Sequence, residues 1–278
     1  MTQLWCNGEW LDSDDLPIAP MDRGAILGLG LFETILALDG VPVFADRHLA
    51  RLRAGCQRLG WETPLPDLQK IAGELLVMNK LTSGRARIRL AITGGSGSIN
   101  DLTAGTDRVV SIIACPLDDT PVSLTVSLSP WPRNERSPLA GLKSASYAEN
   151  LVALDHARRQ GFDETLFLNT AGHLCEAATA NFFLVKNGAL HTPSINSGCL
   201  PGITRAVVIA LAARHGISSE ERVTGLDDLH SADEIFLTSS TRGLAAVSRF
   251  GDRIFRPGPV TESLRGFWNE EIRRKIPG

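Results

Sequence analysis

The chain of 278 residues is 43% hydrophobic, which is enough apolar content to fill one large domain or two of ordinary size. Its formal net charge of −3 provides no basic surface for nucleic acid or an anionic membrane, so small-molecule chemistry is the expected function class. No apolar run approaches the roughly 20 residues that span a bilayer, and the N-terminus does not look like a signal peptide. We therefore expect a cytoplasmic protein without nucleic-acid or membrane partners.

Cysteine usage argues against a disulfide framework and against a metal centre. The five cysteines are odd in number, widely scattered and without a CxxC pair. Zinc sites and disulfide scaffolds both need closely and regularly spaced cysteines. We expect free thiols and no bound metal.

The N-terminal part is expected to form an α/β domain over residues 1–115. Apolar runs bounded by turn-forming residues indicate strands, and apolar residues at helical spacing indicate helices. In chain order, the patterns predict a hairpin around Asn7-Gly8, strands over 31–38 and 41–44, helices over 45–59 and 67–79, and strands over 86–93 and 108–115 on either side of a Gly/Ser-rich loop over 94–101.

A short polar segment with prolines, residues 116–122, is the predicted linker to a second α/β domain over residues 123–278. Ser146 and Glu149 form a capping-box pattern that is expected to open a helix running to about residue 160. The other predicted elements are strands over 124–128, 164–169, 174–175, 181–185 and 190–192, a helix introduced by residues 200–204 and ending near 215, and strands over 234–238 and 244–247.

One lysine stands apart from the other four in the chain. Lys143 has small, apolar or hydroxylated neighbours, whereas the others belong to an amphipathic helix, a turn or a basic tail. Desolvation in such surroundings would lower the pKa of a lysine and let it form an imine with an aldehyde. At this point a plain surface lysine is an equally open interpretation. The only tyrosine of the chain, Tyr147, follows four residues later.

Two hydroxyl-rich turns in the second domain could bind an anion. Gly202-Ile203-Thr204 lies at a predicted helix N-terminus, where free N–H groups and the helix dipole favour a phosphate. Ser239-Ser240-Thr241 follows a predicted strand and could add hydroxyl and amide donors. Either turn alone is more often a helix cap or a chain reversal.

Seven motifs occur in one order along the chain. They are Asn7-Gly8, Asp22-Arg23-Gly24 with Gly28-x-Gly30-x-Phe32-Glu33-Thr34, Arg47-His48-x-x-Arg51-Leu52, Leu142-Lys143 with Tyr147, Glu176 with Asn181-Phe182-Phe183, Leu200-Pro201-Gly202-Ile203-Thr204-Arg205, and Thr238-Ser239-Ser240-Thr241. In these motifs the chain, from about Asn7 to Val247, resembles the fold-type IV enzymes that use pyridoxal 5′-phosphate (PLP). That family includes branched-chain and D-amino-acid aminotransferases and aminodeoxychorismate lyase.

The resemblance implies a role for each matching residue. Lys143 would carry PLP as a Schiff base and move the substrate proton. Glu176 would face the pyridine nitrogen and keep it protonated, and Tyr147 would hydrogen-bond the cofactor phenolate oxygen. In branched-chain aminotransferases the tyrosine lies one residue further from the lysine. The implied phosphate-binding residues are Arg51, Ile203, Thr204, Ser240 and Thr241.

The same resemblance leaves the reaction open. D-amino-acid enzymes carry an arginine at the position of Gly94, and branched-chain enzymes carry one at the position of Arg89. Two short segments, Phe32-Glu33-Thr34-Ile35 and Ser239-Ser240-Thr241-Arg242-Gly243, look more like those of the lyase. That enzyme converts 4-amino-4-deoxychorismate to 4-aminobenzoate and pyruvate for folate synthesis. We rank the lyase first, an aminotransferase of branched-chain or, less favoured, D-amino-acid type second, and a PLP-binding protein without turnover third. The implied substrate-binding residues are Phe32, Arg89 and Arg242.

The expected architecture is therefore the two-domain fold of the family. A smaller N-terminal domain and a larger C-terminal domain would hold PLP in the cleft between them, with Lys143 and Glu176 both contributed by the C-terminal domain. The resemblance also implies a homodimer. Composition and periodicity carry no information on assembly.

Overall fold

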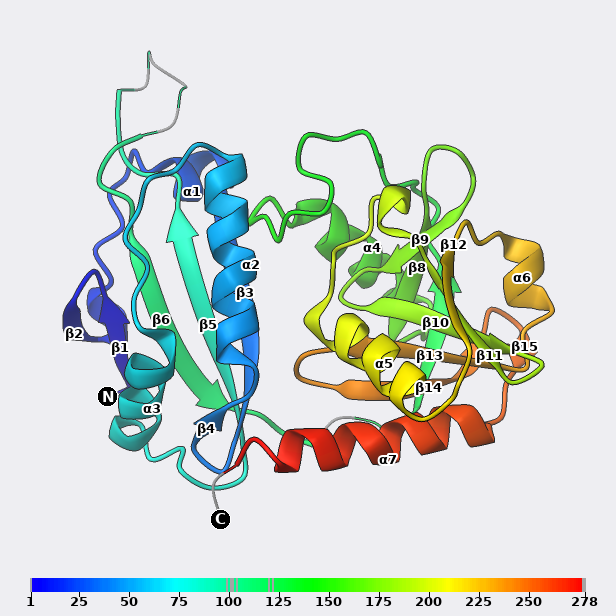
Figure 1. Cartoon of the computed structure of the whole chain (residues 1–278). Coiled ribbons are helices and arrows are strands. Elements are labelled where there is room, and N and C mark those ends of the chain that lie inside the picture. The colour runs from blue at the N-terminus through cyan, green and yellow to red at the C-terminus, as the bar shows by residue number, and fades with distance from the viewer. Residues whose placement is uncertain are drawn as a thin grey trace. The chain divides into compact units, whose positions relative to one another are not determined.

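The computed structural model describes residues 2–98, 100, 103, 105–119, 121 and 123–276. The chain divides into two compact units (Figure 1). Unit 1 comprises Met1–Asp119, Leu142–Tyr147 and Arg274–Gly278, and unit 2 comprises Thr120–Gly141 and Ala148–Arg273. The first stretch of unit 1 thus ends inside the expected linker, in which Thr120 and Val122 lie outside the described residues.

The described residues of unit 1 form a six-stranded sheet with the order β2-β1-β6-β5-β3-β4, in which all neighbouring strands are antiparallel. The predicted N-terminal hairpin and the strands on both sides of the Gly/Ser-rich loop are present. The strands are β1 (Gln3–Cys6), β2 (Glu9–Asp12), β3 (Gly30–Leu38), β4 (Val41–Pro42), β5 (Arg85–Thr93) and β6 (Val110–Pro116), and the helices are η1 (Ser13–Asp15), α1 (Arg23–Leu27), α2 (Ala45–Arg58) and α3 (Leu68–Met78).

Alternation along the strands gives this sheet two different faces. Ile35 of β3 and Ile88 of β5 are fully buried, and they pack in one core cluster with Leu52 of α2 and Leu75 of α3. Figure 1 shows α2 lying along β3 and β5. The alternate residues, which include Phe32, point to the opposite face of the sheet.

The segment around Lys143 pairs with the beginning of β3. The amide N–H of Phe32 donates to the carbonyl oxygen of Lys143 over 3.0 Å, and the amide N–H of Ala145 donates to that of Gly30 over 2.8 Å. A β-bridge joins Leu31 to Ser144. These backbone bonds explain why Lys143 belongs to unit 1, whereas the sequence led us to expect it in the C-terminal domain.

The hydroxyl of Ser146 also binds within unit 1, where it donates to the carbonyl oxygen of Gly28 over 2.9 Å. Helix α4 (Ala148–Arg159) begins two residues later and ends close to the predicted position. The Ser146 hydroxyl therefore does not form the expected capping box with Glu149. It connects the segment around Lys143 to Gly28 at the end of α1.

The described residues of unit 2 form a nine-stranded mixed sheet with the order β12-β11-β10-β13-β14-β7-β8-β9, and β15 pairs with β14. Its core contains Phe182, Leu184, Ile235 and Leu237. The strands are β7 (Ser123–Leu128), β8 (Glu164–Leu168), β9 (Leu174–Ala177), β10 (Asn181–Lys186), β11 (Ala189–Pro193), β12 (Ser219–Arg222), β13 (Glu234–Ser239), β14 (Gly243–Phe250) and β15 (Arg253–Ile254).

Among the described residues, five helical segments complete unit 2. They are α4, η2 (Ile195–Ser197), α5 (Ile203–Arg214), α6 (Leu226–His230) and α7 (Pro259–Arg273). The sequence patterns did not predict β12, α6 or α7. The prediction of an α/β protein with two domains is confirmed. In the part of the chain that the structure describes, every helix is too short or too polar to cross a bilayer.

Candidate active site

Lys143 lies against two aromatic rings in unit 1. Its Nζ is 4.5 Å from the ring centroid of Phe32 and 5.8 Å from that of Tyr147. The two rings meet edge to face, with centroids 5.4 Å apart. The guanidinium of Arg89 lies over the same Phe32 ring at 4.2 Å. The structure thus brings together four residues singled out from the sequence, and it places two cationic groups on one aromatic ring.

Strand geometry explains how Arg89 reaches this place. Arg89 pairs with Thr34 of β3, two residues from Phe32, and its side chain shares the Phe32 face of the sheet. Burial lowers the pKa of Arg89, and the positive charge of Arg87, two residues away on the same face, lowers it further.

The guanidinium groups of Arg87 and Arg89 make no hydrogen bond or ion pair with any described residue. Arg85, at the start of the same strand, is instead paired with Asp119 at 3.5 Å. Buried polar groups are normally satisfied, so the donors of the half-buried Arg89 are suited to an anion. This arrangement can bind a carboxylate beside the Lys143 ammonium.

On the opposite, helix-covered face of the sheet, Glu33 holds two side chains of α2. Arg51 donates to it from Nε over 2.8 Å and from Nη2 over 2.6 Å, and Nδ1 of His48 is 2.7 Å from Oε2. Burial alone would raise the pKa of Glu33, but the hydrogen bonds from Arg51 and His48 lower it to about 2. Burial lowers the pKa of His48, so the imidazole is neutral at pH 7.

These pKa shifts predict a loss of stability in acid. The carboxyl of Glu33 is ionised more readily in the folded chain than in the unfolded one, so its contribution is complete above about pH 4.5 and is lost as the pH falls toward 2. A shift of this size corresponds to about 3 kcal/mol of unfolding free energy. His48 acts in the same direction, because the unfolded chain takes up its proton first as the pH falls below about 6.5.

Urea unfolding of the apo-protein between pH 7 and pH 2.5 measures this effect. The Glu33→Gln variant is expected to be less stable than the wild type at pH 7 and to lose less stability on acidification. Equal pH slopes for the two proteins between pH 4.5 and 2.5 would contradict the assignment.

In unit 2, Glu176 lies at the end of β9 and is largely buried. Its Oε2 accepts a hydrogen bond from the amide N–H of Leu200 over 2.9 Å. Its Oε1 lies 3.6 Å from Nε of Arg133, whose guanidinium covers the ring of Phe167 at 4.5 Å. The backbone contact therefore fixes one carboxylate oxygen and the arginine faces the other.

Sequence reasoning missed Arg133. The residue stands in a polar, proline-rich stretch that looks like an exposed loop, and nothing in the local pattern indicates burial. In the fold, its amide N–H donates to the carbonyl oxygen of Leu168, which brings the side chain to Glu176. The Nε and Nη2 atoms are buried and have no hydrogen-bond partner among the described residues.

The beginning of α5 has the features of an anion site. Gly202 is the N-cap residue and offers no side chain to the first amides of the helix. The hydroxyl of Thr204 is buried and has no hydrogen-bond partner in the described part of the chain. A Cβ on Gly202 would lie 1.9 Å from Oδ1 of Asn181, so a larger residue there would displace the Asn181 side chain. Free amides, a helix dipole and an unsatisfied hydroxyl suit the phosphate of PLP.

The turn between β13 and β14 contains Ser240 and Thr241, both half-buried. Arg242 follows them, and its Nη1 donates to Oε2 of Glu164 and to the hydroxyl of Thr179, each over 3.2 Å. Glu164 is completely buried. The guanidinium of Arg242 is thus engaged by a buried carboxylate within unit 2.

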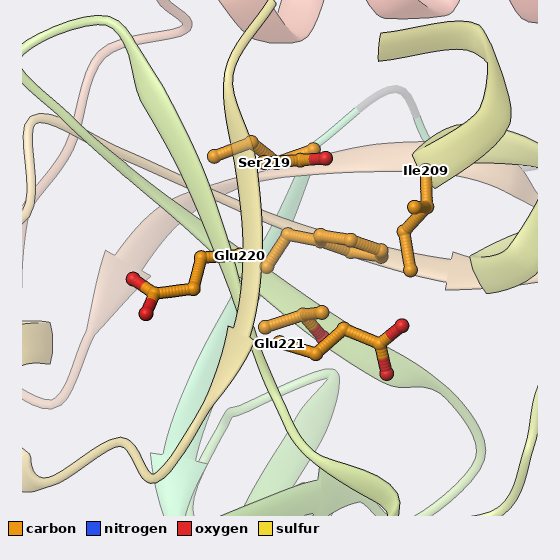
Figure 2. Close-up of a pocket in the computed structure, with 7 residues that line it drawn as sticks. Ile209, Ser219, Glu220 and Glu221 are labelled. Carbon is orange, nitrogen blue, oxygen red and sulfur yellow. The ribbon is translucent and has the colours of Figure 1, made fainter. Parts of the chain in front are cut away.

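A cavity of about 320 Å³ lies elsewhere in unit 2. Figure 2 shows Ser219, Glu220 and Glu221 along one strand at its edge and Ile209 on a helix, with the two carboxylates pointing to opposite sides. Glu221 accepts from Nη2 of Arg205 over 2.5 Å. None of the residues predicted to bind the cofactor or the substrate lines this cavity, although Phe183 belongs to one of the seven motifs. Its remaining lining residues are Phe183, Leu190 and Thr192.

Comparisons with known proteins agree on one family. Residues 30–250 match the model of the amino-transferase class IV family. The chain is 31% identical over 280 residues to the branched-chain-amino-acid aminotransferase of Escherichia coli strain K12, covering 94% of this chain and 90% of that protein. It is 25% identical to the aminodeoxychorismate lyase of Bacillus subtilis strain 168, covering 98% and 96%.

A crystal structure of a branched-chain aminotransferase from the archaeon Thermoproteus uzoniensis with norvaline is similar to this chain, with a TM-score of 0.91 and 25% identity. The similarity covers 99% of this chain and 95% of that one. Both the sequence and the fold are therefore matched over nearly their whole length.

Proposed function

Because the chain belongs to the class IV aminotransferases, a family of PLP-dependent enzymes, we propose that it transfers an amino group between an amino acid of branched-chain type and a 2-oxo acid. The observation that carries this proposal is the position of Arg89 over the Phe32 ring, next to Lys143. An amino acid must present its amino group to the lysine side and its carboxylate to a nearby cation. The guanidinium of Arg89, which has no hydrogen-bond partner among the described residues, is such a cation.

Each residue then has a role. When bound, PLP supplies an aldehyde for the amino group and a ring that accepts electrons. Lys143 attaches the cofactor and moves the proton on the substrate α-carbon. Tyr147 orients the cofactor ring, and Glu176 keeps the ring nitrogen protonated. The phosphate is bound by Arg51, Ile203, Thr204, Ser240 and Thr241, and Phe32 lines the substrate side.

Aminodeoxychorismate lyase, which the sequence ranked first, is the second candidate. Similarity to the Bacillus subtilis enzyme supports it, and so does Arg87, a second guanidinium that suits a substrate with two carboxylates. Arg242, which the sequence led us to expect at a substrate carboxylate, is paired with Glu164 at 3.2 Å. We propose that Arg242 stabilises the turn after β13 and leaves the substrate to Arg89.

One pair of assays separates the two functions. PLP-loaded protein is incubated with branched-chain and other amino acids plus a 2-oxo acid, and separately with aminodeoxychorismate. We expect transfer of the amino group in the first assay and no release of pyruvate or 4-aminobenzoate in the second. Rapid release of pyruvate and 4-aminobenzoate without transamination would show that the protein is a lyase and not an aminotransferase.

An Arg89→Met variant tests the carboxylate contact. Loss of a charge-assisted hydrogen bond to the substrate is expected to raise the KM for the amino acid about 10- to 100-fold, with a smaller change in kcat. Arg85→Met is the matched control, because Arg85 lies on the same strand and face but is paired with Asp119. Steady-state kinetics with equal KM changes in both variants would argue against a substrate role for Arg89.

We also propose that the protein is a cytoplasmic homodimer. The family resemblance supports the dimer, and the absence of a membrane-spanning helix among the described residues is compatible with this location. Sedimentation equilibrium of the purified protein tests the dimer, since the monomer has a mass of 30.0 kDa. A single species at that mass would contradict it.

A further inference from the structure

Glu33 is a buried carboxylate on the helix-covered face of the unit 1 sheet. Its exposed fraction is 0%, so its charge must be met inside the protein. Both of its oxygens receive hydrogen bonds from Arg51, and Oε2 also contacts His48. Three charged or polar contacts at 2.6–2.8 Å fix the position of this carboxylate.

The hydrogen-bonding state of His48 follows from its partner. Glu33 is ionised, and an ionised carboxylate only accepts hydrogen bonds. The Nδ1 atom of His48, 2.7 Å from Oε2, must therefore carry a proton. Since burial keeps the imidazole neutral, the second nitrogen has none. His48 thus acts as a fixed donor to Oε2, the Glu33 oxygen that also accepts from Nη2 of Arg51.

The fork contact also fixes the plane of the Arg51 guanidinium. Nε and Nη2 face Glu33, so the edge that carries Nη1 is directed away from it. The Arg51 side chain is more exposed than the buried Glu33 carboxylate that it binds. His48 and Arg51 are three residues apart on α2 and share one side of the helix.

We propose that Glu33 and His48 are positioning residues that hold the guanidinium of Arg51 in the orientation in which it binds the cofactor phosphate. This inference rests on the phosphate-binding role proposed above for Arg51. Neither Glu33 nor His48 touches the cofactor in this assignment. They act through Arg51 alone.

A competing electrostatic effect has to be separated from positioning. The negative charge of Glu33 also weakens the attraction between Arg51 and a phosphate, so a variant that only removes the charge changes two things at once. Glu33→Asp keeps the charge but shortens the side chain by one methylene group. The aspartate cannot reach both Arg51 nitrogens from the same backbone position, so this variant isolates the geometry.

The experiment compares the affinity of the apo-protein for PLP and for pyridoxal, which lacks the phosphate. Glu33→Asp is expected to weaken PLP binding about 10- to 100-fold, the effect of losing a bidentate contact, and to change pyridoxal binding less than about twofold. The matched control is Glu234→Asp in unit 2. Glu234 is also buried and accepts hydrogen bonds from the amide N–H groups of Val260 and Thr261. The Glu234→Asp variant is expected to leave the ratio of PLP affinity to pyridoxal affinity unchanged.

Two variants of His48 provide a second measurement if Glu33→Asp folds poorly. His48→Asn keeps a side-chain donor near the position of Nδ1, whereas His48→Leu removes it. We expect the ratio of PLP to pyridoxal affinity to be nearly normal in His48→Asn and to fall in His48→Leu. Equal ratios in both variants and in the wild type would overturn the inference.

An Arg51→Met variant separates the failure of this inference from that of the proposed function. If it loses PLP affinity selectively while the Glu33 and His48 variants do not, Arg51 binds phosphate without needing them, and the positioning inference is wrong. If Arg51→Met affects PLP and pyridoxal equally, the phosphate role of Arg51 is itself wrong. Circular dichroism of each apo-protein shows whether the variants are folded.

Discussion

Replacement of Lys143 by alanine is expected to lower kcat about 10³- to 10⁴-fold, because it removes the group that we propose attaches the cofactor and moves the proton. The holoenzyme should also lose its absorbance above 400 nm, which a protonated imine between PLP and a lysine would give. Because the aromatic neighbours Phe32 and Tyr147 are unchanged, we expect PLP to bind still, but without a covalent bond. Absorbance spectroscopy and borohydride reduction followed by mass spectrometry measure these outcomes.

Lys186→Ala is the matched control for that variant. Lys186 is a lysine of unit 2 next to an exposed turn, and its Nζ donates to the hydroxyl of Ser231 over 2.7 Å. Its replacement should leave kcat and the absorbance unchanged. If Lys143→Ala kept both a reducible bond to PLP and normal turnover, the lysine would be assigned wrongly, and the cofactor would be attached elsewhere.

Glu176→Gln is expected to lower kcat about 10²- to 10³-fold, the usual range when a positioned electrostatic partner of the reacting system is lost. Glutamine can still accept the hydrogen bond from the amide of Leu200, so the variant removes the charge and keeps the backbone contact. Without a carboxylate the ring nitrogen would lose its proton and become a poorer electron acceptor. Stopped-flow measurement of the half-reaction with an amino acid reports this step directly.

The neighbouring Arg133 means that the Glu176→Gln variant needs a control for stability. Its guanidinium faces Glu176 at 3.6 Å, so the carboxylate has a positive neighbour even before a cofactor binds. Removing the charge of Glu176 leaves Arg133 buried without that partner, which also costs stability. Glu234→Gln is therefore the control, because it neutralises another buried carboxylate of unit 2. A similar fall in kcat in both variants would show that Glu176 acts only through stability.

The sequence alone determined the cofactor chemistry and the residues proposed to carry it. Lys143, Glu176 and the turns at Thr204 and Thr241 lie within or beside short motifs, and the conformations of such motifs are governed by nearby residues. The α/β alternation, the antiparallel N-terminal hairpin and helices α2 and α5 followed from local periodicity for the same reason. Helix α7 was missed although its apolar residues recur at helical spacing.

Only the tertiary structure decided which residues meet across the fold. Periodicity does not say that the strand after Gly28 would pair with the segment 143–145, and that pairing places Lys143 in unit 1. The ion pairs of Arg242 with Glu164 and of Arg133 with Glu176 join residues 78 and 43 positions apart. Such contacts depend on long-range packing, which local patterns do not encode.

The contrast between Arg89 and Arg51 shows the same division within one unit. In the sequence, both are arginines on amphipathic elements, and their roles came from resemblance. In the fold, strand alternation leaves Arg89 over an aromatic ring without a hydrogen-bond partner among the described residues, whereas Glu33, which is 18 positions away, holds Arg51 by two nitrogens. The sequence thus determined which side chains are candidates for PLP chemistry. Tertiary packing decided which of them is held by a buried carboxylate and which is left with donors for the proposed substrate.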